Sequence, residues 1–293
     1  MISIIITAYK EEKTISKAIQ AFLDNPLRID YELLVFAPDE PTLKKVREFA
    51  KKNKKIRPIK DTGKGKPAAL NLAFQKSKGE ILVLSDGDVF VDKNSLVSLL
   101  KPFFEYSNVG AVTGRPISIN SEKEMLGYWG KVLFNIAHER RLTAIKRKER
   151  IFCSGYLYAF RKSLIKKIPE NLLSEDGYIS HLIYEKKYKI SYAPEARVYV
   201  KYPQNFKDWI IQKKRGIGGY NQIRKMIGAN MRSFSQESSG AFQFLKYIHS
   251  LRQFNWTLLL FFARLYLWIL IFLDINIKQK SFNEVWLRVE STK

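Results

Sequence analysis

Short apolar runs alternate with amphipathic segments through the N-terminal third of the chain. Four of these runs have the length of β-strands: Ile2–Ile6, Tyr31–Phe36, Lys55–Ile59 and Ile81–Leu84. Strands that alternate with helix-length segments are typical of βαβ units, and unbroken apolar runs indicate a sheet covered on both faces. The pattern therefore predicts an α/β fold with a central, mostly parallel sheet.

Polar residues follow each of these strands directly. Thr7-Ala8-Tyr9 follows the first strand, Asp39 the second, Asp61 the third, and Asp86-Gly87-Asp88 the fourth. Ligands of parallel sheets bind outside the carboxyl ends of the strands, so four loops are expected to meet at one binding edge.

The pair Asp86 and Asp88 has two readings. Neighbouring carboxylates repel each other unless a cation neutralises them, and a divalent metal ion that does so can also hold phosphate oxygens. Asp-Gly-Asp is equally good turn chemistry. Taken alone, the pair does not decide between a metal site and a tight turn.

The segment from Asp61 to Asn71, "DTGKGKPAALN", is a glycine-rich loop that carries Lys64 and Lys66 into a helix predicted to begin near Pro67. A basic loop at a helix N-terminus suits anionic groups. It is not a P-loop, because Pro67 follows Lys66 where Ser or Thr is required. The first strand also lacks a G-x-G-x-x-G fingerprint, so ATPase and dehydrogenase functions lose their main support.

The second half of the chain reads mainly as helices. Helical patterns are predicted over Ser121–Arg150, which ends in a basic run, from Glu175, and from about Asn205. The stretch Trp256–Ile275 is the most apolar, and about twenty such residues just cross a bilayer core. Arg264 lies in its middle, where a charge costs about 2.5–3.5 kcal/mol on insertion scales. A spanning helix, an interfacial helix and a buried core helix all remain open.

The charge balance indicates an anionic partner. The 293 residues include 51 Lys and Arg but 28 Asp and Glu, which leaves a formal charge of +23. A polyanion, a phosphate-bearing small molecule or an anionic membrane surface is the expected neighbour. The single cysteine, Cys153, excludes an intrachain disulfide and is expected to be a packed small residue. The N-terminus is predicted to be a strand and not a signal peptide, so the N-terminal domain is expected in the cytosol.

Seven short motifs carry a family resemblance. In chain order they are "TAYKEE", Asp39, "GKGKPAALN", "SDGD", "FCSG", "SED" and "QKKRG". The series resembles that of inverting family 2 glycosyltransferases with the GT-A fold, which include catalytic domains of polysaccharide synthases and polyprenyl-phosphate sugar transferases. The resemblance implies a GT-A catalytic domain over residues 1–220. Residues 221–293 are then expected to form a C-terminal helical region that associates with the cytoplasmic face of the cell membrane.

The resemblance also implies a site for a nucleotide-sugar donor. Thr7 and Tyr9 would line the base pocket, and Asp39 would accept a hydrogen bond from the base. Lys66 would lie near the donor. Gln212 and Arg215 match the ends of a Q-x-x-R-W motif that holds the diphosphate and the acceptor end.

The same resemblance assigns the reacting groups. Asp86 and Asp88 match the motif that binds the sugar nucleotide and a Mn²⁺ or Mg²⁺ ion, and Asp176 takes the place of the general base. A lipid-linked or glycan acceptor near an anionic membrane surface is expected, with no nucleic-acid partner. Gly216 stands where processive synthases have tryptophan, which favours transfer of one or few sugars.

Plainer readings of these residues stay open. Asp39 could be a turn residue, Asp176 a helix cap, and Lys213, Lys214 and Arg215 a solvated basic face. Two other functions are also considered. A sugar-1-phosphate nucleotidyltransferase normally carries a glycine- and arginine-rich loop where "TAYKEE" stands. A basic nucleic-acid-binding protein fits the charge, but the chain has no recognisable binding module.

Overall fold

The structure is a computed structural model that describes residues 1–228, 241–273 and 289–292. Its centre is an eight-stranded sheet in the order β3-β2-β1-β4-β7-β6-β8-β5. The strands are β1 (Ile2–Thr7), β2 (Tyr31–Ala37), β3 (Ile56–Lys60), β4 (Ile81–Asp86), β5 (Val89–Val91), β6 (Val109–Ser118), β7 (Leu157–Arg161) and β8 (Lys189–Val200).

The four predicted strands lie side by side and pair in parallel, in the order β3-β2-β1-β4. The other half of the sheet is mixed: β7 pairs antiparallel with β4 and β6, β6 pairs parallel with β8, and β8 pairs antiparallel with β5. The predicted α/β fold is confirmed. Its parallel character comes from the N-terminal half, where a crossover helix connects each of the four parallel strands to the next.

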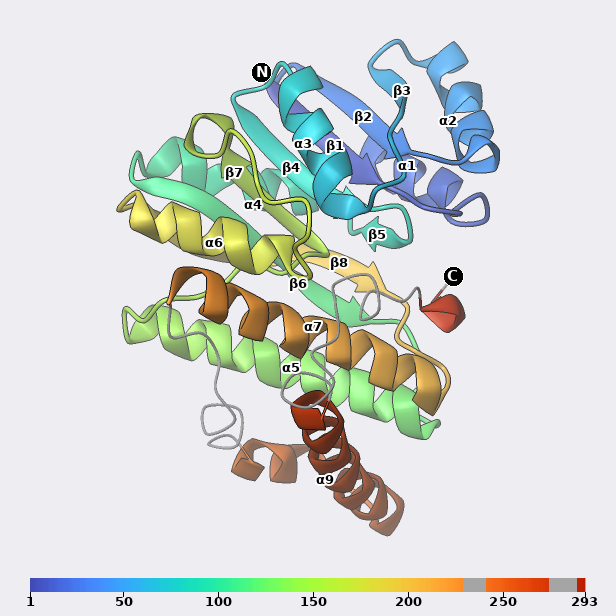
Figure 1. Cartoon of the computed structure of the whole chain (residues 1–293), viewed down its shortest axis with the longest axis vertical. Helices are drawn as coiled ribbons and strands as arrows, with labels where there is room; N and C mark the ends of the chain where they lie inside the picture. Colours follow the sequence, from blue (N-terminus) through green and yellow to red (C-terminus); the bar gives the residue numbers. More distant parts are fainter. Residues whose placement is uncertain (229–240, 274–288, 293) are drawn as a thin grey trace.

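Helices cover both faces of the sheet (Figure 1). Side chains alternate along a strand, so Ile4 and Ile6 pack on one face while Ile5 packs on the other. The first face is covered by α1 (Ile15–Leu23), α2 (Glu40–Lys52) and α4 (Ser95–Glu105). The second face is covered by α3 (Lys66–Lys76) and α6 (Glu175–Glu185), with the short 3-10 helix η1 (Lys162–Leu164) nearby.

A third apolar cluster joins three further helices: α5 (Met125–Lys146), α7 (Phe206–Ile227) and α9 (Leu251–Phe272), together with the 3-10 helix η2 (Ala241–Tyr247). The indoles of Trp129 and Trp209 pack in its centre at 5.3 Å between ring centroids. The Trp129 indole N–H donates to the Trp256 carbonyl oxygen at 2.8 Å, which ties α5 to α9. Figure 1 shows α5 and α7 side by side below the sheet, with α9 beyond them. The predicted helical segments are confirmed here.

The C-terminal residues return to the start of α7. The 3-10 helix η4 (Glu290–Thr292) lies there, and the Ser291 N–H donates to the Asp208 carboxylate at 2.7 Å. The last two residues of the predicted apolar stretch, Asp274 and Ile275, lie outside the described residues.

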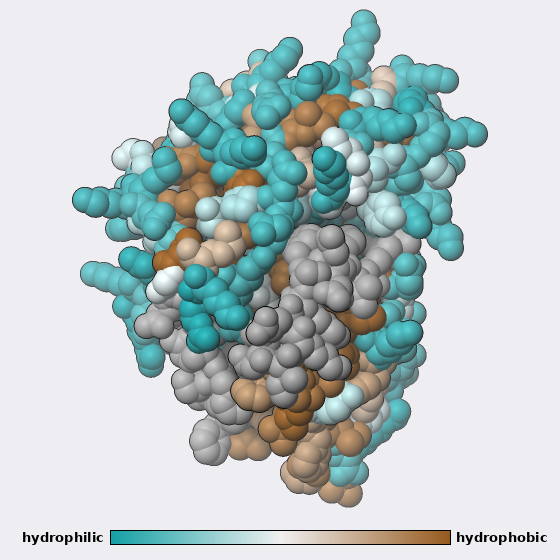
Figure 2. Space-filling view, in the orientation of Figure 1, coloured by the Kyte–Doolittle hydropathy of each residue, from teal (hydrophilic) through white to brown (hydrophobic). Residues whose placement is uncertain are grey.

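Helix α9 is packed on one side and exposed on the other. Residues at helical spacing are buried against α5 and α7: Thr257, Leu260, Ala263, Leu267 and Ile271. The opposite side exposes large apolar residues: Leu251, Phe254, Leu258, Phe262, Leu265, Ile269 and Phe272. Apolar atoms accordingly gather at the lower end of the molecule in Figure 2.

Within the described part of the chain, α9 is the one helix long and apolar enough to cross a membrane, with a mean hydropathy of 1.7. Its most apolar window is 28% buried, so α9 is not a fully buried core helix. This removes one of the three readings of the stretch.

Candidate active site

A cavity of about 1610 Å³ opens at the carboxyl ends of the parallel strands. Eight of the predicted site residues line it: Thr7, Tyr9, Lys66, Asp86, Asp88, Asp176, Gln212 and Arg215. They come from the end of β1 and the loop after it, from the start of α3, from the end of β4 and its turn, and from α6 and α7. Asp39 is not among the lining residues, although its neighbour Pro38 is.

The ends of β1 and β4 are held in register. Thr7 pairs with Asp86 across the two strands, and its hydroxyl donates to Asp86 Oδ1 at 3.1 Å. The Gly87 N–H donates to the Thr7 carbonyl oxygen at 3.0 Å, and a Cβ at Gly87 would lie 2.8 Å from the Ala8 Cβ. Glycine is therefore required between the two aspartates. The Asp-Gly-Asp segment is a tight turn, and this turn places both carboxylates at the cavity.

Lys66 links two carboxylates from distant parts of the chain. It begins α3 after Gly65, whose φ of +102° suits glycine, and the Lys66 ammonium lies 2.7 Å from both Asp86 Oδ1 and Glu175 Oε1. Burial disfavours the charged ammonium, but the two carboxylates outweigh it and raise the pKa of Lys66. Lys66 is therefore a charged ammonium held between the end of β4 and the start of α6.

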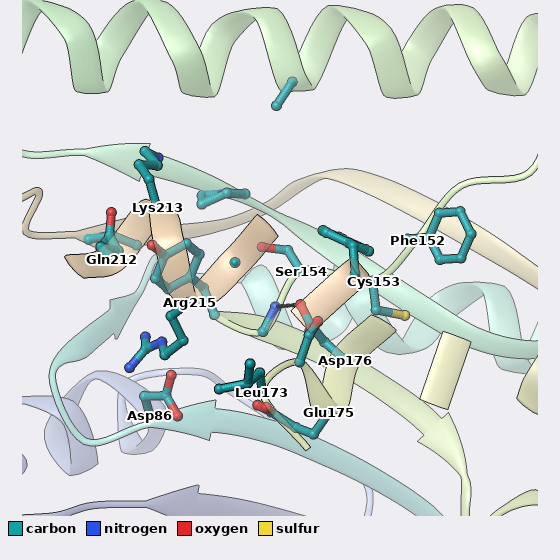
Figure 3. Close-up of a pocket in the computed structure, with 18 of the residues that line it drawn as sticks. Asp86, Phe152, Cys153, Ser154, Leu173, Glu175, Asp176, Gln212, Lys213 and Arg215 are labelled. Atoms are coloured by element: carbon teal, nitrogen blue, oxygen red, sulfur yellow. Dashed lines mark hydrogen bonds between the residues drawn. The ribbon is translucent and has the colours of Figure 1, made fainter. Parts of the chain in front are cut away.

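Asp176 is held at the start of α6 with its carboxylate at the cavity (Figure 3). Its Oδ2 accepts from the Gly155 N–H at 2.8 Å, and its Oδ1 accepts from the Ser174 hydroxyl at 2.6 Å and the Gly177 N–H at 2.8 Å. The N-cap of α6 is Ser174. The Gly177 N–H donates to both Ser174 Oγ at 3.4 Å and Asp176 Oδ1 at 2.8 Å, so Asp176 shares the capping of α6 with Ser174 while three donors orient its carboxylate.

Asp39 has a structural role in this fold. Its Oδ1 accepts from the Thr42 N–H at 3.0 Å, which caps α2, and its Oδ2 accepts from the Lys10 N–H at 2.8 Å. Burial opposes ionisation, but these hydrogen bonds outweigh it and lower the pKa of the Asp39 carboxyl. Asp39 is therefore a helix cap, where the alternative considered from the sequence was a turn residue, and base recognition by Asp39 stays a prediction. Asp61 lines the cavity instead, and burial raises its pKa.

Helix α7 supplies Gln212 and Arg215 from the opposite wall. Figure 3 shows the Arg215 guanidinium pointing toward the Asp86 carboxylate. Gln212 Oε1 is buried without a hydrogen-bond partner in the described structure, which leaves an acceptor for a ligand donor. Lys213 also lines the cavity, so this part of the basic run is not simply a solvated face. A Cβ at Gly216 would meet nothing within 4 Å.

Several residues that line the cavity were not among those predicted from the sequence. Tyr156 lies amid the charged groups: burial raises its pKa to about 12, Arg215 opposes this, and Asp88, Asp86 and Asp176 add to it. Glu175 pairs with Lys66, and its place in "SED" was the available signal. Arg140, Arg141 and Arg264 also line the cavity. A lone arginine within an apolar helix was a signal that Arg264 faces a polar space.

Cys153 lines the cavity as a packed residue. It is 2% exposed, and burial raises the pKa of its thiol to about 12. A thiol held protonated in this way is a poor nucleophile, in agreement with the packing role predicted for it.

The residues fit a divalent cation that arrives with a diphosphate. Asp86 and Asp88 offer carboxylate oxygens, the ligand type that Mg²⁺ and Mn²⁺ prefer. The described residues contain no group of three or more His, Cys, Asp or Glu placed to hold a metal ion. Mg²⁺ commonly binds through one or two carboxylates and completes its shell with substrate phosphates and water.

Comparison with known proteins decides the family. The family model "Glycosyltransferase like family 2" matches residues 1–219. The chain belongs to glycosyltransferase family 2. This confirms the predicted resemblance. Every predicted site residue lies within the matched residues 1–219.

Curated relatives of this family 2 chain include a probable glycosyltransferase, YdaM, of Bacillus subtilis, which is 25% identical over 76% of the chain and 56% of its own length. A poly-beta-1,6-N-acetyl-D-glucosamine synthase of Staphylococcus aureus is 23% identical over 76% of the chain and 55% of its own length. The chain thus spans about half the length of these relatives.

Solved structures share the fold. A mannosyltransferase, PcManGT from Pyrobaculum calidifontis in complex with GDP-Man and Mn²⁺, superposes with a TM-score of 0.60 at 17% identity, covering 94% of this chain and 80% of its own. S. aureus TarS 1–349 in complex with UDP gives a TM-score of 0.50 at 16% identity, covering 83% of this chain and 69% of its own. The predicted GT-A fold of this family 2 chain is confirmed.

Proposed function

We propose that the chain transfers a sugar from a nucleotide-sugar donor to a lipid-linked or membrane-proximal acceptor, with a divalent cation and with inversion at the anomeric carbon. One observation carries the proposal. Asp86 and Asp88 from the end of β4 and Asp176 from the start of α6 line a single cavity, together with Lys66 and Arg215.

The charges of the cavity suit departure of a nucleoside diphosphate. Negative charge develops on the leaving phosphate oxygen, and the cations Lys66 and Arg215, which line the same cavity, would stabilise it. A Mn²⁺ or Mg²⁺ ion held by Asp86 and Asp88 would neutralise the diphosphate when bound. These groups make the donor end of the cavity.

Asp176 is proposed as the general base. Its carboxylate would take the proton of an acceptor hydroxyl as that oxygen attacks the face of the anomeric carbon opposite the diphosphate. The hydrogen bonds from Gly155, Ser174 and Gly177 keep it aimed at the cavity. A single displacement of this kind inverts the configuration of the sugar.

The acceptor end is proposed to lie at a membrane surface. Arg264, Leu267 and Trp268 of α9 line the same cavity, while the other side of α9 exposes apolar residues. An amphipathic helix of this kind suits the boundary between headgroups and acyl chains. Arg140 and Arg141 add positive charge that complements a phosphate-bearing acceptor and anionic lipid. We propose the cytoplasmic face of the cell membrane as its location.

Release of nucleoside diphosphate tests the reaction. The purified protein is incubated with Mn²⁺ or Mg²⁺, a panel of sugar nucleotides and a polyprenyl-phosphate acceptor, and the anomer of the product is read by NMR. Metal-dependent release that is lost in Asp88→Ala is expected. Release that persists in Asp88→Ala, or without metal, contradicts the mechanism, and a retained anomer contradicts inversion.

Vesicle flotation tests the membrane proposal. Phe262→Ser on the outer side of α9, where Phe262 is 59% exposed, is expected to weaken flotation with anionic vesicles. The matched control is Phe104→Ser on α4, because Phe104 is 63% exposed and lies on another helix. Equal effects of the two substitutions, or a protein that ignores anionic vesicles, contradict docking through α9.

A further inference from the structure

The ammonium of Lys66 lies between two carboxylates that have different tasks. Asp86 belongs to the proposed metal pair, whereas Glu175 precedes the proposed base Asp176 in α6. The Lys66–Asp86 and Lys66–Glu175 distances are both 2.7 Å, and the three side chains are 20%, 27% and 10% exposed. The cluster is therefore well shielded from water, so its ion pairs are strong and directional.

Asp86 Oδ1 already accepts from two donors. The Thr7 hydroxyl lies 3.1 Å from it and the Lys66 ammonium 2.7 Å. A divalent cation at Asp86 competes with this ammonium for the same carboxylate and repels it at close range. Lys66 therefore has to loosen its contact with Asp86 as the cation arrives.

The Glu175 carboxylate is the second ion-pair partner of the Lys66 ammonium. As a residue Glu175 is 8% exposed, and a carboxylate buried to this degree is costly unless a cation stays beside it. Lys66 and Glu175 thus have a common reason to remain paired while Asp86 changes partner.

We propose that Glu175 is a positioning residue that retains Lys66 when a divalent cation displaces it from Asp86. Lys66 acts as the resident cation of the Asp86 carboxylate before the donor binds, and the Lys66–Glu175 pair then keeps the start of α3 against the start of α6. Asp176, the next residue, stays in place through the exchange. This inference rests on the proposed function, because it assumes a metal-bound donor at Asp86.

The pair makes a specific prediction for metal affinity. In Glu175→Gln, Lys66 has Asp86 as its remaining carboxylate partner, so Mn²⁺ binding is expected to weaken about fivefold. In Lys66→Met the competing ammonium is gone, so Mn²⁺ binding is expected to tighten. The change in net charge alone also predicts weaker Mn²⁺ binding in Glu175→Gln and tighter binding in Lys66→Met. The double variant Lys66→Met/Glu175→Gln therefore decides whether Glu175 acts through Lys66.

The experiment measures Mn²⁺ affinity by electron paramagnetic resonance, with and without UDP or GDP, for the wild type, both single variants and the double variant. If Glu175 acts through Lys66, Glu175→Gln changes affinity less than about twofold in the Lys66→Met background. An equal loss in both backgrounds overturns the inference. Glu149→Gln serves as control, since Glu149 lines the cavity near Arg147 and is expected to leave Mn²⁺ affinity unchanged.

Two further results separate the possibilities. A wild type that binds no Mn²⁺ with either nucleotide overturns the proposed function together with this inference, whereas Mn²⁺ binding without coupling overturns the inference alone. If Glu175→Gln loses its folded circular dichroism, Lys66→Met tests the displacement of Lys66 from Asp86, on which the inference depends. It must then tighten Mn²⁺ binding without nucleotide, and unchanged or weaker binding overturns the exchange.

Discussion

The two ends of the cavity are built in different ways. At the donor end, strand register fixes Thr7 beside Asp86, Gly87 allows no side chain, and Lys66 closes ion pairs to both sides. At the opposite wall, helices α5, α7 and α9 supply long cationic side chains, and Gly216 faces open space.

The difference suggests separate roles for the strand ends and for the helical wall. Hydrogen-bonded strand ends place short carboxylates with little freedom, which suits chemistry that needs fixed distances. Long arginine side chains on packed helices adapt to ligands of varied shape while keeping positive charge. We therefore expect substitutions at the donor end to have large effects on rate or stability, and substitutions in the helical wall to have graded effects on acceptor affinity.

The largest effect is expected for Asp176→Asn, which tests whether the fixed carboxylates control the rate. An amide keeps the shape of the side chain but cannot take the proton, so kcat is expected to fall by about 10²–10⁴-fold. Single-turnover transfer to a hydroxyl acceptor measures it. Glu149→Gln, at an exposed carboxylate of the same cavity, should keep wild-type kcat.

A smaller loss in Asp176→Asn carries its own information. An acceptor that enters as an ionised phosphate needs no base, so an unchanged kcat with a polyprenyl phosphate and a large loss with a hydroxyl acceptor would identify the acceptor chemistry. An unchanged kcat with both acceptors contradicts the role of Asp176.

Substitutions at Gly87 and Gly216 compare the packing at the two ends of the cavity directly. Gly87→Ala would place a Cβ 2.8 Å from Ala8 and 3.3 Å from Glu11, and it is expected to lower the free energy of unfolding by about 1–3 kcal/mol. Gly216→Ala meets nothing within 4 Å and lies in α7, so no loss is expected there. Urea denaturation of both variants measures the difference, and equal destabilisation contradicts the contrast.

The helical wall is tested by Arg264→Gln. Loss of one cation from the cavity is expected to raise the KM for a phosphate-bearing acceptor several-fold while kcat changes little, because Arg264 lies away from the reacting groups in this proposal. Arg252→Gln is the matched control on the same helix: Arg252 donates to the Lys123 carbonyl oxygen and does not line the cavity. A fall in kcat with unchanged KM would place Arg264 at the chemistry instead.

The smallest expected effect concerns the Asp39 cap. Because hydrogen bonds lower the pKa of Asp39 in the folded chain, its ionised carboxylate adds stability above its ordinary pKa of 3.8, and this contribution is lost as the pH falls through the folded-state value. Asp39→Asn should therefore flatten the acid side of the stability profile and leave Mn²⁺ affinity unchanged. Urea midpoints between pH 7 and about pH 3 measure it; an unchanged acid slope contradicts the role of the cap.

Local sequence predicted much of the fold and of the donor end. The predicted strands ended within one residue of the ends of β1 and β2 and two residues before the end of β4, since a buried strand needs unbroken apolar side chains and its loop does not. The polar residues after those strands were then expected at one edge, because parallel strands end together. Eight of the nine predicted site residues line the cavity; the strand ends account for those that follow β1, β3 and β4, whereas Asp176, Gln212 and Arg215 lie on helices and were predicted from the family resemblance.

The tertiary structure decided what no short segment encodes. The insertion of β7 between β4 and β6 brings "FCSG" to the cavity, and packing of α9 turns Arg264 inward. The same holds for Lys66 and Glu175, whose pairing depends on where α3 and α6 meet. Asp39 followed a strand like the others, but its carboxylate satisfies the exposed N–H groups at the start of α2. Sequence fixes which groups follow each strand, whereas ion pairs and caps are settled by distances between segments that only folding brings together.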